Sequence, residues 1–252
     1  MKYDVGVNAS IAMQNTLLEG DQSSAGSRTE LAYQVLRSEI LRGALLPGQR
    51  LRAADLEARF SLGLTPIREA LMRLGTEGLV IAESNRGARV KGVSQAEFAD
   101  LMKTRREVER ICLRDSVTAG DARWEAELIA AMHMLSRAQL PDASAAQERD
   151  DSSADGTGQW EACHRRFHTA LVSACGSPWM LRFWNQLVDH SERYRKLRFS
   201  TPLVPRNVEA EHQELLETAL RRDVAACVDL MDRHLQGTEK AVQHMLAEWT
   251  GT

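Results

Sequence analysis

The chain has 252 residues and a formal net charge of −3, from 32 Lys and Arg against 35 Asp and Glu. Its length allows one large domain or two modest ones. The four cysteines occur singly, without Cys-x-x-Cys spacing, which indicates buried thiols in a reducing cytoplasm and argues against a disulfide framework. Residues 1–27 contain no apolar run suited to an export signal or a membrane span. We therefore expect a flexible tail there, on a cytoplasmic protein without a membrane partner.

The segment 28–93 begins with two predicted helices. Apolar residues recur at helical spacing in each of them, and a turn at residues 61–64 follows the second. The marker residues are Leu31, Val35, Ile40 and Leu41 for the first helix, and Leu56 and Phe60 for the second.

A third helix is expected to begin at Thr65, which supplies an N-cap oxygen, with Pro66 at the first helical position. Gly78 ends it. Arg68 and Arg73 lie off its apolar stripe and are expected to point outward. The stripe itself consists of Ile67, Ala70, Leu71 and Leu74.

Two short strands, over residues 79–82 and 88–93, are predicted around the hairpin tip Asn85-Arg86-Gly87. Helix, helix-turn-helix and wing in this order indicate a protein that binds double-stranded DNA. Residues 28–92 carry 11 Lys and Arg against 7 Asp and Glu, which suits contact with phosphates. A homodimer is expected, because such proteins commonly read paired half-sites. The predicted DNA contacts are Thr65, Pro66, Arg68, Arg73, Asn85, Arg86 and Gly87.

After Val93 the pattern is wholly helical. A capping box at Ser94 to Glu97 opens a long helix. Further helices are expected over about 121–138, 160–175, 179–199, 207–221 and 223–248, and residues 141–159 read as a mobile loop. The expected fold class is thus mainly α: a tail over 1–27, an N-terminal winged helix-turn-helix over 28–93, and a C-terminal all-α bundle over 94–252.

Four histidines in the helical part form two matched pairs. His164 and His168 are four residues apart on one apolar stripe. His212 and His234 are 22 positions apart and equidistant from a turn near Arg222, which places them side by side in an antiparallel helix hairpin. Either they are satisfied core histidines or they bind a divalent metal. Unpaired buried imidazoles are unfavourable, which favours a metal site.

Arg105 falls between Met102 and Val108, on the buried side of its helix. A buried guanidinium needs an anion. Glu109 on the same helix could supply it. Alternatively, Arg105 receives the carboxylate of an effector. Tyr194 and Arg195 are further candidates for the far end of a dicarboxylate, and either could equally be a solvated helix residue.

The run Thr65-Pro66-Ile67-Arg68-Glu69-Ala70-Leu71 closely resembles the hallmark of the winged-helix domain of GntR-family transcription regulators. The resemblance covers about residues 28–93. This chain has Gly63 and Leu64 where the family usually has a Ser-Arg pair, so a usual DNA contact is missing. The resemblance implies a transcription regulator, with a repressor expected.

The helical part resembles the FCD effector domain of the FadR-type branch of that family. Phe167-His168, His212 and His234 match its metal motif, while His164 stands where many members have Asp. An all-imidazole set suits zinc best, with nickel as the second choice. The family's Arg in the first helix of this domain implies that Arg105 receives a small carboxylate. The stretch from His164 to Arg195 looks most like regulators that respond to carbon starvation and to dicarboxylates such as glutarate.

A helical-bundle metalloenzyme is the alternative. Glu161 with His164 and Glu209 with His212 have the Glu-x-x-His spacing of di-iron bundles. Such sites also need an inward Glu from each of two other helices, and the helices near 121–138 and 179–199 offer none on their apolar stripes. No nucleophile with a base or phosphate loop is visible. We therefore expect a regulator and not an enzyme.

Overall fold

The computed structural model describes residues 27–83, 87–138, 153–198 and 206–250. The chain divides into two compact units, Met1–Gly92 and Val93–Thr252, and each is described by itself. The predicted tail, the wing tip at residues 84–86 and most of the predicted loop lie outside the described residues. Within the described ranges, no helix combines the length and apolar character needed to cross a bilayer.

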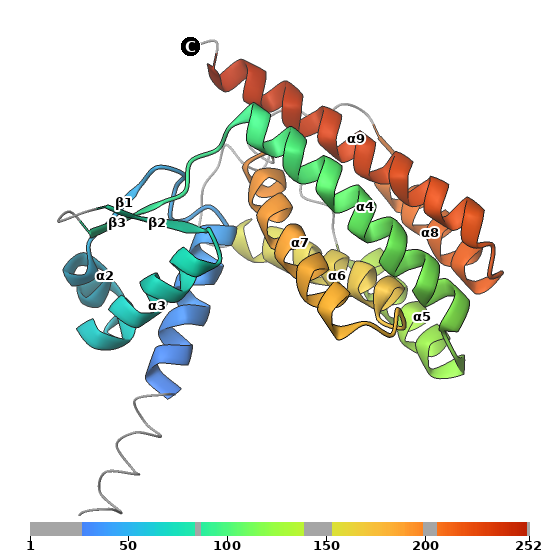
Figure 1. The fold of residues 1–252 in the computed structure, drawn as a ribbon, viewed down its shortest axis with the longest axis horizontal. Coiled ribbons are helices and arrows are strands. Elements are labelled where there is room, and N and C mark those ends of the chain that lie inside the picture. The colour runs from blue at the N-terminus through green and yellow to red at the C-terminus, as the bar shows by residue number, and fades with distance from the viewer. Residues whose placement is uncertain (1–26, 84–86, 139–152, 199–205, 251–252) are drawn as a thin grey trace, which may run out of the picture. The chain divides into compact units, whose positions relative to one another are not determined.

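The first unit is a winged helix-turn-helix (Figure 1). A helix over residues 27–41 is followed by β1 (Arg50–Leu51), α2 (Ala53–Phe60), α3 (Leu64–Thr76), β2 (Val80–Glu83) and β3 (Gly87–Val90). The sheet order is β1-β3-β2, and both pairings are antiparallel. The helices and the wing hairpin were predicted. Strand β1 was not, because two residues are too few to show a periodic pattern.

One apolar core holds this unit together. The apolar stripe of α3 belongs to one cluster with buried residues of the helix over 27–41 and of the sheet. Burial of these apolar side chains is the main favourable contribution to the folding of this unit. The fully buried members include Leu36, Ile40, Leu45, Ile67, Leu74 and Val90.

The predicted start of the recognition helix is wrong by two residues. Helix α3 begins at Leu64, and its N-cap is Gly63, with φ 89° and no side-chain cap. The Ile67 amide donates to the Gly63 carbonyl at 3.2 Å. Glycine reaches this positive φ without strain, so the chain can turn into the helix two residues earlier. Thr65 and Pro66 consequently lie inside the first turn, and Thr65 is exposed rather than used as a cap.

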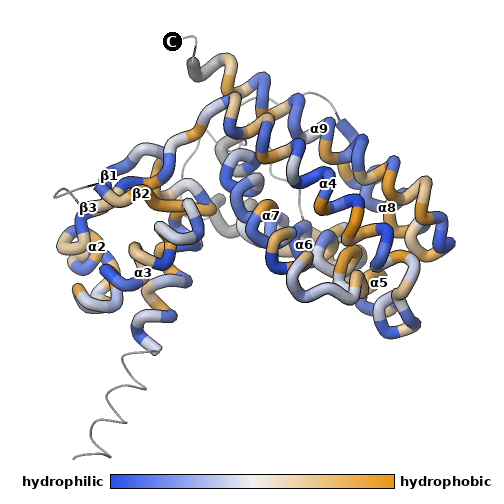
Figure 2. Tube along the Cα trace, viewed as in Figure 1, coloured by the Kyte–Doolittle hydropathy of each residue, from blue (hydrophilic) through white to orange (hydrophobic). Residues whose placement is uncertain are grey.

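The second unit consists of helices throughout its described residues. They are α4 (Gln95–Ala119), α5 (Ala122–Arg137), α6 (Ser153–Val172), α7 (Pro178–Arg198), α8 (Val208–Leu220) and α9 (Val224–Thr250). Helix α4 packs on α7 and α9, α5 packs on α6, and α8 packs on α9. Figure 2 shows hydrophobic and hydrophilic residues alternating along α4, as expected of a helix with one buried face. The mainly α fold class is confirmed.

Capping residues fix where several of these helices begin. The Ser94 hydroxyl accepts from the Glu97 amide at 3.1 Å, as the capping box predicts. Asp121 caps α5 and Asn207 caps α8 in the same way. These caps place the helix starts that the sequence predicted near residues 94, 121 and 207.

The loop predicted over residues 141–159 is shorter than expected. Helix α6 begins at Ser153, so residues 153–159 are helical, and residues 139–152 lie outside the described part. Residues 153–159 show no apolar periodicity in the sequence. Adding turns to an existing helix costs much less than nucleating one, so a polar segment can extend α6 backwards from its packed part.

Candidate functional site

Arg68 and Thr65 lie on the exposed face of α3. Among the described residues Arg68 has no ion-pair partner. Its guanidinium is therefore available to a base edge or a phosphate. Pro66 is half-buried beside it. This agrees with a recognition helix whose apolar stripe faces the core and whose opposite face is polar.

Arg73 lies off the apolar stripe and is exposed, as predicted, but it is paired within the protein. Its Nη1 lies 2.6 Å from Glu30 Oε2, and its guanidinium carbon lies 3.6 Å from the centroid of the Tyr33 ring. These contacts hold Arg73 against the first helix. The Tyr33 hydroxyl donates to Glu77 at 2.8 Å and continues the same network. Arg73 is half-exposed but already paired within the protein.

The second strand of the wing, β3, begins at Gly87, whose φ is 92°. A Cβ at this position would lie 3.0 Å from the Leu51 carbonyl oxygen, so glycine is needed for the close pairing of β3 with β1. Arg89 on β3 pairs with Glu83 at 2.7 Å. Asn85 and Arg86, the predicted tip contacts, lie outside the described residues.

The four predicted histidines converge inside the helical unit. His164 and His168 come from α6, His212 from α8 and His234 from α9, and all four are buried. One ring nitrogen from each lies within 4.8 Å of those of the other three. His168 Nε2 is 3.2 Å from His164 Nε2 and 3.3 Å from His212 Nε2. The sequence predicted each pair. Helix α4 packs on both α6 and α9, and α5 packs on both α6 and α8, which brings the two pairs together.

Burial keeps these imidazoles neutral. Desolvation, reinforced by the positive charge of Arg195 and by the other histidines, lowers the pKa of His164 well below its usual value. Burial also lowers the pKa of His212 to about 4. The pKa values of His168 and His234 are lowered in the same way. Neutral imidazoles are the form that binds a metal ion.

The donor set fits a divalent transition metal. A tetrahedral Zn–N length of about 2.0–2.1 Å corresponds to nitrogen–nitrogen separations of roughly 3.3–3.4 Å. The two Nε2–Nε2 distances, 3.2 Å and 3.3 Å, are close to this value. The Nδ1 atoms of His164 and His168 are buried without a hydrogen-bond partner. His212 and His234 have supports behind the ring: the backbone of Val208 and the Glu211 carboxylate, respectively.

Arg105 is buried, as predicted, and has partners in the protein. Its Nη1 donates to Ser191 Oγ at 2.5 Å, and its Nε lies 3.5 Å from Glu109 Oε2. The same carboxylate oxygen accepts from Trp184 Nε1 at 2.7 Å. The Glu109 pairing left open by the sequence is therefore present. Glu109 Oε1 and Arg105 Nε remain without a hydrogen bond of good geometry.

The other two predicted effector residues, Arg195 and Tyr194, have different partners: Arg195 contacts Glu161, and Tyr194 contacts the backbone of Ser94. The Arg195 guanidinium makes a two-point contact with Glu161, with Nε 3.1 Å from Oε1. Its charge lowers the pKa of His164 and His168, so it lies close to the histidines. The Tyr194 hydroxyl accepts from the Ser94 amide at 3.4 Å, at the start of α4, away from the cluster.

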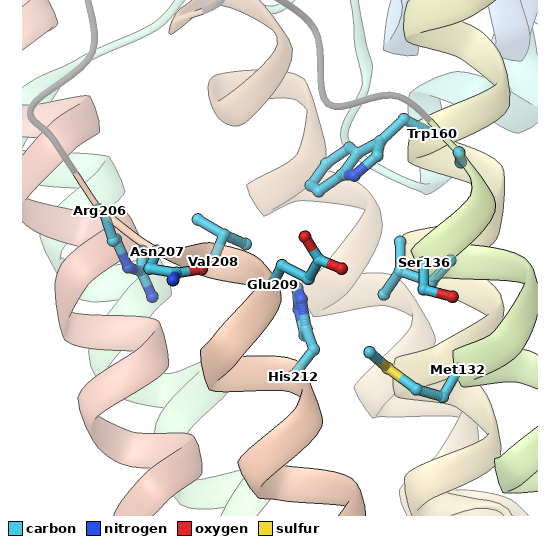
Figure 3. A pocket seen from close by; sticks show the side chains of 10 residues that line it. Met132, Ser136, Trp160, Arg206, Asn207, Val208, Glu209 and His212 are labelled. Atoms are coloured by element: carbon cyan, nitrogen blue, oxygen red, sulfur yellow. The ribbon is translucent and has the colours of Figure 1, made fainter.

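A cavity of about 180 Å³ reaches the histidine cluster (Figure 3). His212 lines it, and Arg206 and Glu209 face Trp160 and Ser136 across it. Arg105 does not line it. Arg206 was missed by the sequence reading, because it stands outside the helical periodicity, next to the cap of α8. The lining is completed by Met132, Leu135, Ala138, Asn207 and Val208.

In the described part of the chain, the carboxylate ligands that a di-iron site needs are not among the grouped ligand atoms of this arrangement. Glu161 is held by Arg195. Within the described ranges, the grouped metal-ligand atoms at the cluster all come from histidines. A di-iron bundle needs several bridging or terminal carboxylates.

Comparisons with known proteins agree on one family. The FCD domain model matches residues 100–237, and the model for bacterial regulatory proteins of the gntR family matches residues 28–90. The HTH-type transcriptional regulator BphR of Paraburkholderia xenovorans is 37% identical over 217 residues, 86% of either chain. The HTH-type transcriptional repressor GlaR of Escherichia coli K12 is 32% identical over 219 residues, 85% of this chain and 96% of GlaR.

Solved structures show the same fold. E. coli McbR/YncC has a TM-score of 0.71 and covers 87% of this chain and 98% of its own, at 20% identity. A GntR regulator from Rhodococcus sp. RHA1 has a TM-score of 0.65 at 22% identity and covers 86% of this chain and 97% of its own.

Proposed function

Because the chain belongs to the GntR family and carries an FCD domain, it is a DNA-binding transcription regulator and not an enzyme, and we propose that it is a repressor controlled by a small carboxylate bound beside a metal ion. The observation that carries the proposal is the buried cluster of four neutral imidazoles. Repression is supported by the similarity to GlaR, which is a repressor.

The proposed metal is zinc, with nickel as the second choice, held by His164, His168, His212 and His234. Imidazole is a good ligand for both ions. A bound ion would supply a positive centre that accepts carboxylate oxygens. The protein contributes the neutral ring nitrogens, a water-poor surrounding and the cavity beside His212.

The proposed effector is a small carboxylate. Dicarboxylates such as glutarate belong to this class. Arg105 and Arg195 both lower the pKa of His168 through their positive charge, so an anion near the histidines would lie in a positive field. Binding to Arg105 would require the anion to share or replace Glu109. Tyr194 holds the Ser94 amide where α4 begins, and we propose that it anchors this helix start rather than contacting the effector.

The proposed regulator is a cytoplasmic homodimer that binds double-stranded operator DNA through α3 and the wing. If a carboxylate favours one arrangement of the sensor helices, ligand and DNA affinities must be coupled reciprocally, by a typical 1–3 kcal/mol. The junction between Gly92 and Val93, next to the helix cap at Ser94, is the covalent route for that coupling.

The test is a fluorescence anisotropy titration of operator DNA with the zinc-loaded full chain, with and without glutarate and related acids. Arg105→Ala should retain operator binding and lose the effector response. Because this change leaves Glu109 buried without its cation, Arg105→Lys is measured alongside it. Arg110→Ala, which removes an exposed arginine of the same helix, is the control and should respond as wild type does.

Two results would refute the mechanism. If no carboxylate in the panel changes wild-type operator affinity, effector control is wrong while DNA binding stands. If Arg105→Ala and Arg105→Lys both respond as wild type does, Arg105 is not an effector residue.

A further inference from the structure

Arg206, the residue just before the cap of α8, ties two helices together next to the histidine cluster. It makes a two-point contact with the Glu211 carboxylate, with Nε 2.5 Å from Oε1. It also donates to the His234 carbonyl at 2.7 Å and to Thr238 Oγ1 at 3.2 Å. The Arg206 side chain is only 17% exposed. It therefore bridges α8 and the middle of α9 in a nearly closed setting.

Glu211 decides which ring nitrogen of His234 carries the proton. Glu211 Oε2 lies 2.9 Å from His234 Nδ1. A carboxylate oxygen can only accept, so at this distance Nδ1 must be protonated and donate. Arg206 Nη2, 3.2 Å from the same nitrogen, is a donor too and cannot bond to a protonated Nδ1. The neutral ring then has its lone pair on Nε2, the nitrogen available to a metal.

Arg206 in turn fixes the carboxylate. Two parallel N–H donors hold both oxygens of Glu211, so the group cannot rotate away from His234. Carboxylates placed behind a metal-binding histidine act in this way: they orient the ring, fix its tautomer and raise its basicity.

Gly237 leaves the space in which Arg206 lies. A Cβ at position 237 would be 2.7 Å from the Arg206 guanidinium carbon and 2.9 Å from its Nε and Nη1. Glycine inside a helix costs about 1 kcal/mol relative to alanine. Its presence in α9, three residues after His234, is explained by the close approach of the guanidinium to the helix backbone.

We propose that Arg206 and Glu211, seated against Gly237, are positioning residues that set the metal affinity of the site through His234. The inference rests on the proposed metal site and adds two residues that do not themselves bind the ion. Loss of such supporting partners typically weakens metal binding 10–100-fold.

The experiment measures zinc affinity of the full chain by competition with a chromogenic chelator. The variants are Glu211→Gln, Arg206→Gln, Arg206→Lys and Gly237→Ala. The control is Arg221→Gln, which breaks an exposed pair with Glu217 on the same stretch of chain. Glu211→Gln and Arg206→Gln should bind zinc about 10–100-fold more weakly than wild type, and Arg206→Lys should recover part of the loss. Gly237→Ala should weaken zinc binding although it removes no polar group.

Melting of the chelator-treated proteins separates positioning from a purely structural role. A variant that binds zinc more weakly but melts with wild type when metal-free supports the inference. If the variants bind zinc as tightly as wild type and Arg221→Gln do, the inference is wrong and the metal site stands. A loss of affinity that only follows a loss of metal-free stability also overturns it. If wild type itself binds no metal, the metal site of the proposed function fails, and this inference with it.

Discussion

Acidification should destabilise the metal-free protein well above the pH at which carboxylates titrate. Burial holds the pKa of each clustered histidine below its usual 6.5, so the folded state stays neutral while the unfolded chain binds protons. The histidines' contribution to the free energy of unfolding is therefore fully present above pH 6.5. It is lost progressively as the pH falls from 6.5 to the pKa of the folded state. For His212 that range runs from 6.5 to about 4.

The size of the loss follows from the same shifts. A shift from 6.5 to about 4 at His212 corresponds to about 3 kcal/mol, at about 1.36 kcal/mol per pKa unit. His164, His168 and His234, whose pKa values are lowered by the same burial, add to this loss. Glu109 opposes this by at most one proton, because burial raises its pKa. The loss is comparable to the total stability of many domains, about 5–15 kcal/mol.

The assay is urea denaturation of chelator-treated protein at pH 7.5, 6.5, 6.0 and 5.5, followed by circular dichroism. His212→Gln should reduce the pH dependence by about one proton. The exposed His133 is the control, and His133→Gln should leave the dependence unchanged. A free energy of unfolding that is constant within about 1 kcal/mol from pH 7.5 to 5.5 would show that burial does not keep these histidines neutral in the folded state. If the folded state binds fewer protons than the unfolded chain, linkage requires the free energy of unfolding to fall with pH.

Four further outcomes are expected. Arg68→Ala should weaken specific operator binding by about 1–3 kcal/mol without changing the melting temperature, and unchanged affinity in a footprinting titration would remove Arg68 from the interface. Arg86→Ala should lower affinity evenly across sequences and reduce the salt slope by about one unit, and an unaltered slope counts against a phosphate contact. His168→Ala should lose metal by elemental analysis and, with it, the roughly 2.7 kcal/mol that zinc at a hundredfold excess over Kd contributes; equal metal content would contradict this. Ser94→Ala should cost about 1 kcal/mol by removing the cap of α4, measured by urea denaturation, with no change as the contrary result.

The family and, apart from β1, the order of elements can be read from the amino-acid sequence alone. The recognition helix, its apolar stripe and the wing glycine are local features, readable because helical and strand periods place neighbouring residues on defined faces. The pairing of His212 with His234 was equally readable, since a turn at Arg222 lies midway between them. Their ring centroids are 4.8 Å apart.

Which charged groups meet depends on how the elements pack in three dimensions. Arg73 looked outward along its own helix, but Glu30 and Tyr33, some forty residues earlier, hold it. Arg105 meets Ser191, 86 residues away in the sequence, besides its neighbour Glu109.

The same holds for the surroundings of the histidine cluster. Each pair can be predicted from the sequence, but their convergence depends on α4 and α5, which pack on α6 and also on α9 and α8, respectively. In this arrangement His168 Nε2 lies 3.3 Å from His212 Nε2. The support of His234 by Arg206 depends on a guanidinium that lies outside any periodic element. Helical periodicity specifies which face a residue occupies, and the close packing of different helices specifies what that face touches.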